Sequence, residues 1–190
     1  RMADLYEDTL RTLLKRQVLD TDMRVLVVCG GESDRDVFVA CGFENVVISN
    51  LDSCAEGNHF APYEWSSQDA ESLTYEDHSF DLCVAHSGLH HCRSPHRGLL
   101  ERYRVACRAV VVFEPIDNCF TRFGVRFGLG EEYELGSVAG HGCLAGGVRN
   151  TSIPNYVYRW NKRDVEKTIH SAAPIGKHDF HYFYRTQLNW

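Results

Sequence analysis

The feature that most constrains the fold is a run of mostly β-branched residues that ends in two glycines. Residues 24–29 read Arg-Val-Leu-Val-Val-Cys, and Gly30 and Gly31 follow directly. Such a run predicts a buried strand that enters a tight turn. A helix capped by Ser33 is expected next, followed by a second buried strand over residues 45–49. A strand, a turn, a helix and a strand within about 30 residues form a βαβ unit with parallel strands.

The alternation of strands and helices continues as far as residue 113. Further strands are expected over residues 63–66, 80–85 and 107–113. A helix between the last two begins at Ser94 as its cap, with Pro95 in the first helical position. We therefore predict an α/β fold: a Rossmann-like, mostly parallel sheet with helices on both faces.

Glycines set the second half of the chain apart. Residues 117–150 form a glycine-rich, irregular excursion, which we interpret as a substrate loop or lid. Alternating aromatic and polar residues predict a late strand over 179–184. A sheet of this kind finishes with a further strand, so we expect the chain to be truncated. The prediction is one domain over residues 1–190, with its cofactor-binding half at 24–115.

Composition restricts the partners and the compartment. The formal net charge is −6, which disfavours a basic surface for nucleic acid. The longest uncharged apolar runs have five residues, whereas a membrane helix needs about 20. The eight cysteines contain no Cys-x-x-Cys pair and are interpreted as free thiols rather than a disulfide framework. We expect a soluble, cytoplasmic protein without a signal peptide, and its oligomeric state is left open.

Three segments in a fixed order carry a family resemblance. They are Gln-Asp-Ala-Glu-Ser-Leu at 68–73, Phe-Asp-Leu-Cys-Val-Ala-His-Ser-Gly-Leu-His-His at 80–91, and Ala-Val-Val-Val-Phe-Glu-Pro at 109–115. Together with the first turn they resemble the class I S-adenosylmethionine-dependent methyltransferases, of the methyltransferase type 11 kind. The resemblance covers residues 24–115 and implies S-adenosylmethionine as cofactor.

Carried over residue by residue, the resemblance implies a cofactor site. It puts the methionine moiety over Cys29, Gly30 and Gly31, where small residues permit close backbone approach. It puts the ribose at Asn50 and Leu51. The chain departs from the family pattern at four positions, namely Val27, Cys29, Ser33 and Asn50. The amide at position 50 replaces an acid and predicts weaker ribose binding.

The resemblance also implies an adenine site and a catalytic histidine. Asp69 would accept a hydrogen bond from the exocyclic amine of adenine, beside Ala70. His86 would face the sulfonium and the methyl acceptor. A histidine can remove a proton from the acceptor, so His86 is the first catalytic candidate, followed by His90 and then His91.

The same region contains the densest group of polar side chains in the sequence, His86, His90, His91, Cys92 and His96. Three interpretations are open: proton transfer, a metal site, or histidines that merely border a ligand cleft. The spacing lacks the two ligand pairs of known zinc sites, so we assign no metal ligand.

The expected function is S-adenosylmethionine-dependent methyl transfer to a small molecule, and the acceptor cannot be deduced. The alternative is a binding or scaffolding module that keeps the fold but has lost cofactor affinity. A dinucleotide oxidoreductase is disfavoured, because the turn lacks the Gly-x-Gly-x-x-Gly spacing.

Overall fold

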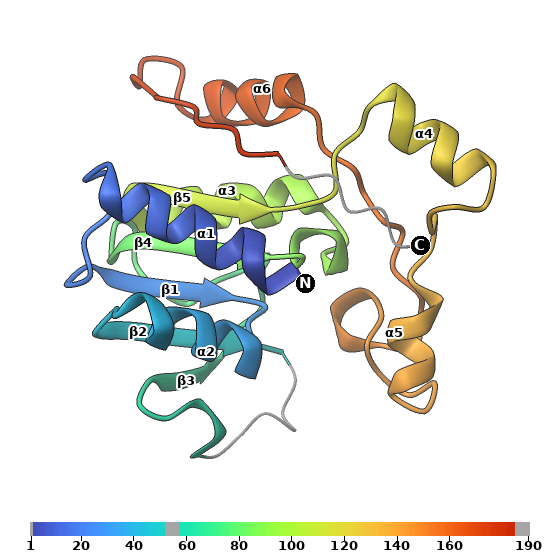
Figure 1. Ribbon diagram of the computed structural model, residues 1–190, viewed down its shortest axis with the longest axis horizontal. Helices are drawn as coiled ribbons and strands as arrows, with labels where there is room; N and C mark the ends of the chain where they lie inside the picture. Colours follow the sequence, from blue (N-terminus) through green and yellow to red (C-terminus); the bar gives the residue numbers. More distant parts are fainter. Residues whose placement is uncertain (1, 52–57, 185–190) are drawn as a thin grey trace.

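The computed structural model describes residues 2–51 and 58–184, and its centre is a five-stranded parallel sheet (Figure 1). The strand order is β3-β2-β1-β4-β5. The strands are β1 (Arg24–Val28), β2 (Asn45–Asn50), β3 (Glu64–Ser67), β4 (Phe80–His86) and β5 (Ala106–Phe113). The chain winds outward in both directions from β1, so the strand order reverses between β1 and β4. The predicted Rossmann-like sheet is confirmed.

Helices cover both faces of this sheet. The helices are α1 (Met2–Lys15), α2 (Glu32–Cys41), α3 (Pro95–Val105), α4 (Cys119–Arg126), α5 (Leu135–Gly140) and α6 (Lys162–Ala172). Short 3-10 helices are η2 (Asn58–Phe60), η3 (Leu89–His91) and η4 (Val148–Asn150). In Figure 1, α1 and α2 lie in front of the sheet and α3 lies behind it. Within the described residues, none of these helices has the length and apolarity that crossing a bilayer requires.

Alternating residues of the central strand divide the core into two layers. Val25 and Val27 pack with α1 and α2, whereas Leu26 and Val28 pack on the other face with Val105 of α3. This is the period of two that a strand imposes on its side chains. A third cluster joins α3 to α6 around Trp160.

The sequence predicted the N-terminal caps of two helices, and the structure confirms one of them. Ser94 caps α3 by accepting from the backbone N–H of Arg97, as predicted. The prediction of Ser33 as a helix cap was wrong, because Gly31 is the N-cap of α2. The Asp34 carboxylate accepts from the Gly31 N–H at 2.9 Å, and this bond begins the helix two residues earlier than expected.

The predicted late strand was also wrong. Residues 179–184 form no ladder with the described strands. The alternating side chains contact α6 instead. Phe180 packs on the core cluster that includes α6, and the Tyr182 hydroxyl donates to the Glu166 carboxylate of that helix at 3.0 Å. An extended segment lying on a helix buries every second side chain just as a strand does.

The glycine-rich segment is more regular than predicted. It contains α4 and α5, and the cap residue Asn118 begins α4 by accepting from the Thr121 N–H. No side chain of α4 is buried. We call residues 117–150 the lid segment from here on.

The cysteines that the structure describes are free thiols, as predicted. Cys54 lies outside the described residues. Burial raises the pKa of Cys83 to about 12, and that of Cys92 to the same value. These two thiols therefore serve as small apolar core residues.

Candidate active site

The first turn brings the backbone of β1 close to its neighbours. Cys29 has a φ of +59°, and the Gly30 N–H donates to the Ser49 carbonyl at 2.9 Å. A Cβ on Gly88, at the end of β4, would lie 2.7 Å from the Cβ of Cys29. The turn and the end of β4 are thus in contact at the point where the strand order reverses, which is where open α/β sheets bind ligands.

A cavity of about 170 Å³ opens beside this turn. From the sheet side it is lined by Cys29, Asn50, Leu51, Asp69 and Ala70 among others. Residues of the lid segment line its other side, namely Ser137, His141, Gly146, Gly147, Arg149 and Asn150. Sites for small molecules enclose roughly 300 to 1,000 Å³, so a nucleoside cofactor requires the lid segment to move outward.

The structure brings together five of the eight residues predicted to hold the cofactor. Cys29, Asn50, Leu51, Asp69 and Ala70 border this cavity. The other three, Gly30, Gly31 and His86, belong to the adjoining backbone turn and strand end. Asp52, a second ribose candidate two residues after Asn50, lies outside the described residues.

The Asn50 side chain is engaged with the backbone. Its Nδ2 donates to the Gly30 carbonyl at 3.1 Å, and its Oδ1 accepts from the Leu51 N–H at 2.7 Å. The amide thereby joins the end of β2 to the first turn. An acid at this position would lack the donor that the Gly30 carbonyl uses.

Asp69 is paired with the lid segment. Its Oδ1 accepts from the Glu71 N–H at 3.0 Å, and its Oδ2 accepts from the Arg149 guanidinium. Arg149 itself has a φ of +51°, a left-handed backbone conformation that is uncommon outside glycine. The carboxylate proposed for adenine is therefore held by a cation of the lid.

His86 ends β4, as predicted, and its ring stacks on Tyr6 of α1. The ring centroids are 4.7 Å apart and the planes differ by 14°. The Phe113 ring meets the His86 ring edge to face, with 5.8 Å between the two centroids. The ring is partly exposed, so it keeps access to solvent at the carboxyl end of the sheet.

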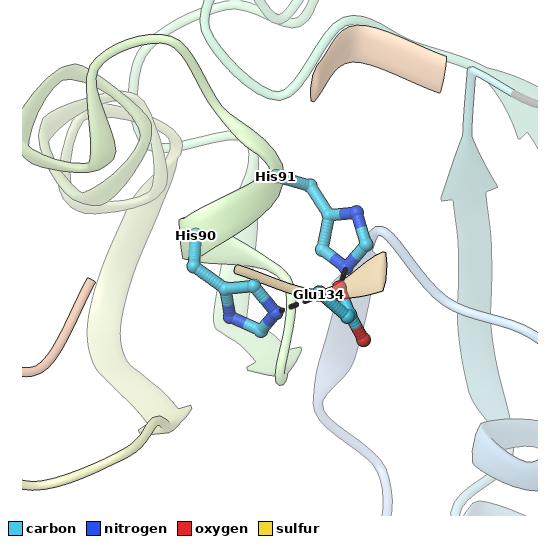
Figure 2. A group of neighbouring side chains, drawn as sticks. All are labelled: His90, His91 and Glu134. Atoms are coloured by element: carbon cyan, nitrogen blue, oxygen red, sulfur yellow. Dashed lines mark ion pairs between the residues drawn. The ribbon is translucent and has the colours of Figure 1, made fainter. Parts of the chain in front are cut away.

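His90 and His91 meet an acid of the lid segment (Figure 2). The Nε2 atoms of His90 and His91 lie 3.5 and 3.3 Å from Oε2 of Glu134. On its other side, His90 Nδ1 lies 3.0 Å from Oε2 of the buried Glu114. We call His90, His91 and Glu134 the His–Glu cluster.

The two histidines of this cluster differ in charge. Burial lowers the pKa of His90, but the hydrogen bonds to Glu114 and Glu134 outweigh burial and raise it to about 9. Burial and the neighbouring His90 lower the pKa of His91. Near neutral pH His90 is protonated and His91 is neutral, so His90 has a proton to donate rather than a free site to accept one.

Sequence reasoning singled out both histidines but missed the partners that orient them. Glu114 belongs to the quoted Glu-Pro motif but had no predicted role, and Glu134 was not among the candidate residues. Asn155, which is fully buried and contacts His91 Nδ1 at 2.8 Å, carried no signal. These partners lie 24 to 64 residues from the histidines, so no local pattern marks them.

The geometry can now be compared with known proteins. Residues 37–112 match the family model described as a methyltransferase domain. Over this stretch, which is 76 of its 190 residues, the chain is similar to the class I methyltransferases. This match confirms the resemblance read from the sequence, and the matched family is a family of enzymes. No curated protein matches the chain.

Several solved structures share the fold of this chain. A protein of Bacillus halodurans named as a methyltransferase is 20% identical, with a TM-score of 0.56 over 87% of this chain and 68% of that one. YcgJ of Bacillus subtilis is 13% identical, with a TM-score of 0.55 over 86% and 67%. An S-adenosylmethionine-dependent methyltransferase of Methanosarcina mazei is 16% identical, with a TM-score of 0.51 over 83% and 80%. The chain thus spans about two thirds of the first two proteins.

Proposed function

We propose that this chain is a methyltransferase that binds S-adenosylmethionine in the cavity beside the first turn and transfers its methyl group to a small molecule. The observation that carries the proposal is the convergence of Cys29, Asn50 and Asp69 on one cavity at the carboxyl ends of the parallel strands. Asp69 supplies an acceptor suited to the amine of adenine. The net charge of −6 favours a small acceptor over a nucleic acid backbone.

The residues of the chain contribute position and proton transfer. When bound, S-adenosylmethionine supplies an electrophilic methyl group on a sulfonium. The cavity walls align the acceptor with this group, and alignment of two reactants can lower a barrier by about 7 kcal/mol or more. The lid segment excludes water once closed. His86, at the end of β4, accepts the proton that an O–H or N–H acceptor loses during transfer.

Calorimetric titration of the purified chain tests this proposal. S-adenosylmethionine and S-adenosylhomocysteine are expected to bind at one site, whereas NAD is not. Replacing Asp69→Ala should weaken S-adenosylhomocysteine binding by about 1 to 3 kcal/mol, because a charged hydrogen bond is lost. Asp36→Ala is the matched control, since Asp36 is an exposed aspartate of α2.

Two outcomes would contradict the proposal. Absence of binding by either adenosyl compound would favour the binding or scaffolding module instead of the enzyme. Equal affinity in wild type and Asp69→Ala, with the control also unchanged, would remove Asp69 from the adenine site while leaving the cofactor assignment in place.

A further inference from the structure

In the His–Glu cluster, the distances from the histidine nitrogens to the Glu134 carboxylate are longer than those of charge-assisted hydrogen bonds. A charge-assisted N–H···O bond measures about 2.7 to 2.9 Å. The two Nε2 atoms instead lie 3.5 and 3.3 Å from Glu134 Oε2, and one ligand atom from each of the three residues lies within 4.8 Å of the others. Ligands bound tetrahedrally to zinc at 2.0 to 2.2 Å are separated by about 3.4 Å. The two distances to Glu134 are therefore close to such an edge, and the ligand nitrogens of the two histidines lie within 4.8 Å of each other.

The tautomer of His90 is determined by a buried carboxylate. Glu114 Oε1 accepts from the backbone N–H groups of Gly88 and Leu89 at 2.9 and 2.7 Å, and its Oε2 faces His90 Nδ1. Glu114 therefore keeps a proton on Nδ1, while Nε2 faces Glu134. Without a metal, a proton on Nε2 is the cation between this nitrogen and the carboxylate, and a metal ion can replace that proton. A carboxylate behind a histidine is also the arrangement that orients histidine ligands in metal sites.

His91 reaches the same state when the Asn155 amide turns over. As placed, Asn155 Nδ2 lies 2.8 Å from His91 Nδ1 and also contacts Glu134 and the Gly146 carbonyl. Its Oδ1 is buried without a partner among the described residues. Turning the amide lets Oδ1 accept from a His91 Nδ1–H. It also places Oδ1 beside the Glu134 and Gly146 oxygens, to which Nδ2 had donated. His91 Nε2 then also presents a lone pair toward Glu134.

We propose that His90, His91 and Glu134 bind one divalent transition metal ion, with Zn²⁺ as the preferred ion. Two imidazole nitrogens and one carboxylate are a known ligand set of zinc sites that keep one position open. His91 also lines the cavity, so a fourth ligand can be supplied from there. The ion joins the lid segment, through Glu134, to η3 of the core. This proposal concerns binding of the metal and does not depend on methyl transfer.

Metal titration of the full chain tests the site. The chain is purified without a histidine tag and with the exposed cysteines Cys107, Cys119 and Cys143 changed to serine, so that these thiols cannot bind the ion. After treatment with a chelator, Zn²⁺ binding is measured by calorimetry and Co²⁺ binding by visible absorption. One ion per chain is expected, and Co²⁺ should give the strong absorption of a four-coordinate nitrogen and oxygen site without a thiolate band.

Matched variants localise the ion. Glu134→Gln and His91→Gln should each weaken Zn²⁺ binding at least tenfold. Glu132→Gln, in the lid segment, and His181→Gln, at an exposed position outside it, change the same residue types and should bind as the unsubstituted chain does.

Several results would overturn the proposal. They are the absence of stoichiometric binding, a thiolate band in the Co²⁺ spectrum, or undiminished binding by Glu134→Gln. Circular dichroism checks that each variant folds. If Glu134→Gln does not fold, X-ray absorption of the Zn²⁺-loaded parent chain counts its histidine ligands, and fewer than two would exclude the site. A proton on His90 would then be the only cation that the cluster holds.

Discussion

Gly30 is the residue at which the first turn has no room for a side chain. A Cβ built there would lie 2.8 Å from Ile48 Cγ2 and 2.8 Å from Val27 Cγ1. Both neighbours are fully buried in the core. The backbone cannot easily move away, because the Gly30 N–H is bonded to the Ser49 carbonyl.

We predict that Gly30→Ala lowers the free energy of unfolding by about 1 to 3 kcal/mol, the usual cost of overpacking a core. Gly136→Ala in α5 is the control, because a Cβ there would meet no described atom within 4 Å apart from its chain neighbours and the backbone of its own helix. This change should not lower the free energy of unfolding, because alanine favours a helix over glycine. Urea unfolding measures both variants, and an unchanged stability of Gly30→Ala would show that the turn adjusts to an added methyl group.

At the scale of elements, a charged clip ties α3 to the segment that follows the adenine candidate. Glu101 and Arg104 on α3 bond each other through two N–H···O contacts of 3.0 and 2.8 Å. Arg104 also donates to the carbonyls of Leu73 and Tyr75, and Glu101 accepts from the Leu73 N–H. The clip therefore fixes the chain that leads from Asp69 into β4.

This clip makes stability depend on pH. The hydrogen bond from Arg104 lowers the pKa of Glu101 below its ordinary value of 4.5. A lowered pKa means that the carboxylate stabilises the fold above pH 4.5 and that this contribution is lost as the pH falls through the lower, folded value.

Glu101→Gln should therefore reduce the free energy of unfolding at pH 7 by about 1 kcal/mol, a value reduced for solvent screening. The difference from wild type should shrink at acidic pH. Urea unfolding at several pH values measures it, with Glu76→Gln, an exposed glutamate of the same segment, as the control. A difference that does not vary with pH would mean that Glu101 acts by packing alone.

At the scale of the molecule, the lid segment is fastened to the cofactor-binding half on two sides of one cavity. Arg149 bonds Asp69 on one side, and Glu134 meets His90 and His91 on the other. The cavity between them is small for a nucleoside cofactor, as shown above. If S-adenosylmethionine binds in this cavity as proposed, its binding includes the opening of the Arg149 contact.

We predict that Arg149→Gln tightens S-adenosylhomocysteine binding severalfold. In this variant no ion pair with Arg149 has to break before Asp69 can accept a hydrogen bond from the adenine amine. Each tenfold change in affinity corresponds to about 1.4 kcal/mol. Calorimetric titration measures the change, and Arg126→Gln, in α4 of the same lid segment, is the control. Weaker binding by Arg149→Gln alone would instead make Arg149 a contact of the bound ligand.

The sequence by itself determined the parallel sheet, the strands that form it and the resemblance to a family. The runs that form β1, β2, β4 and β5 are continuous in the chain, and their apolar character reports burial directly. The Gly30-Gly31 turn, the Ser94 cap and the motif around Asp69 are local as well. Such features depend on neighbours within a few residues, so they can be read without coordinates.

The tertiary structure alone decided how the distant parts meet. The alternation at 179–184 fits a strand and a segment packed on α6 equally well, and only the neighbouring elements distinguish the two. Arg149 pairs with Asp69 across 80 residues, and Glu134 reaches His91 across 43 residues of chain, 134 minus 91. Contacts of this kind are set by how the lid segment folds back over the sheet, which depends on packing of the whole molecule and leaves no periodic trace in the sequence.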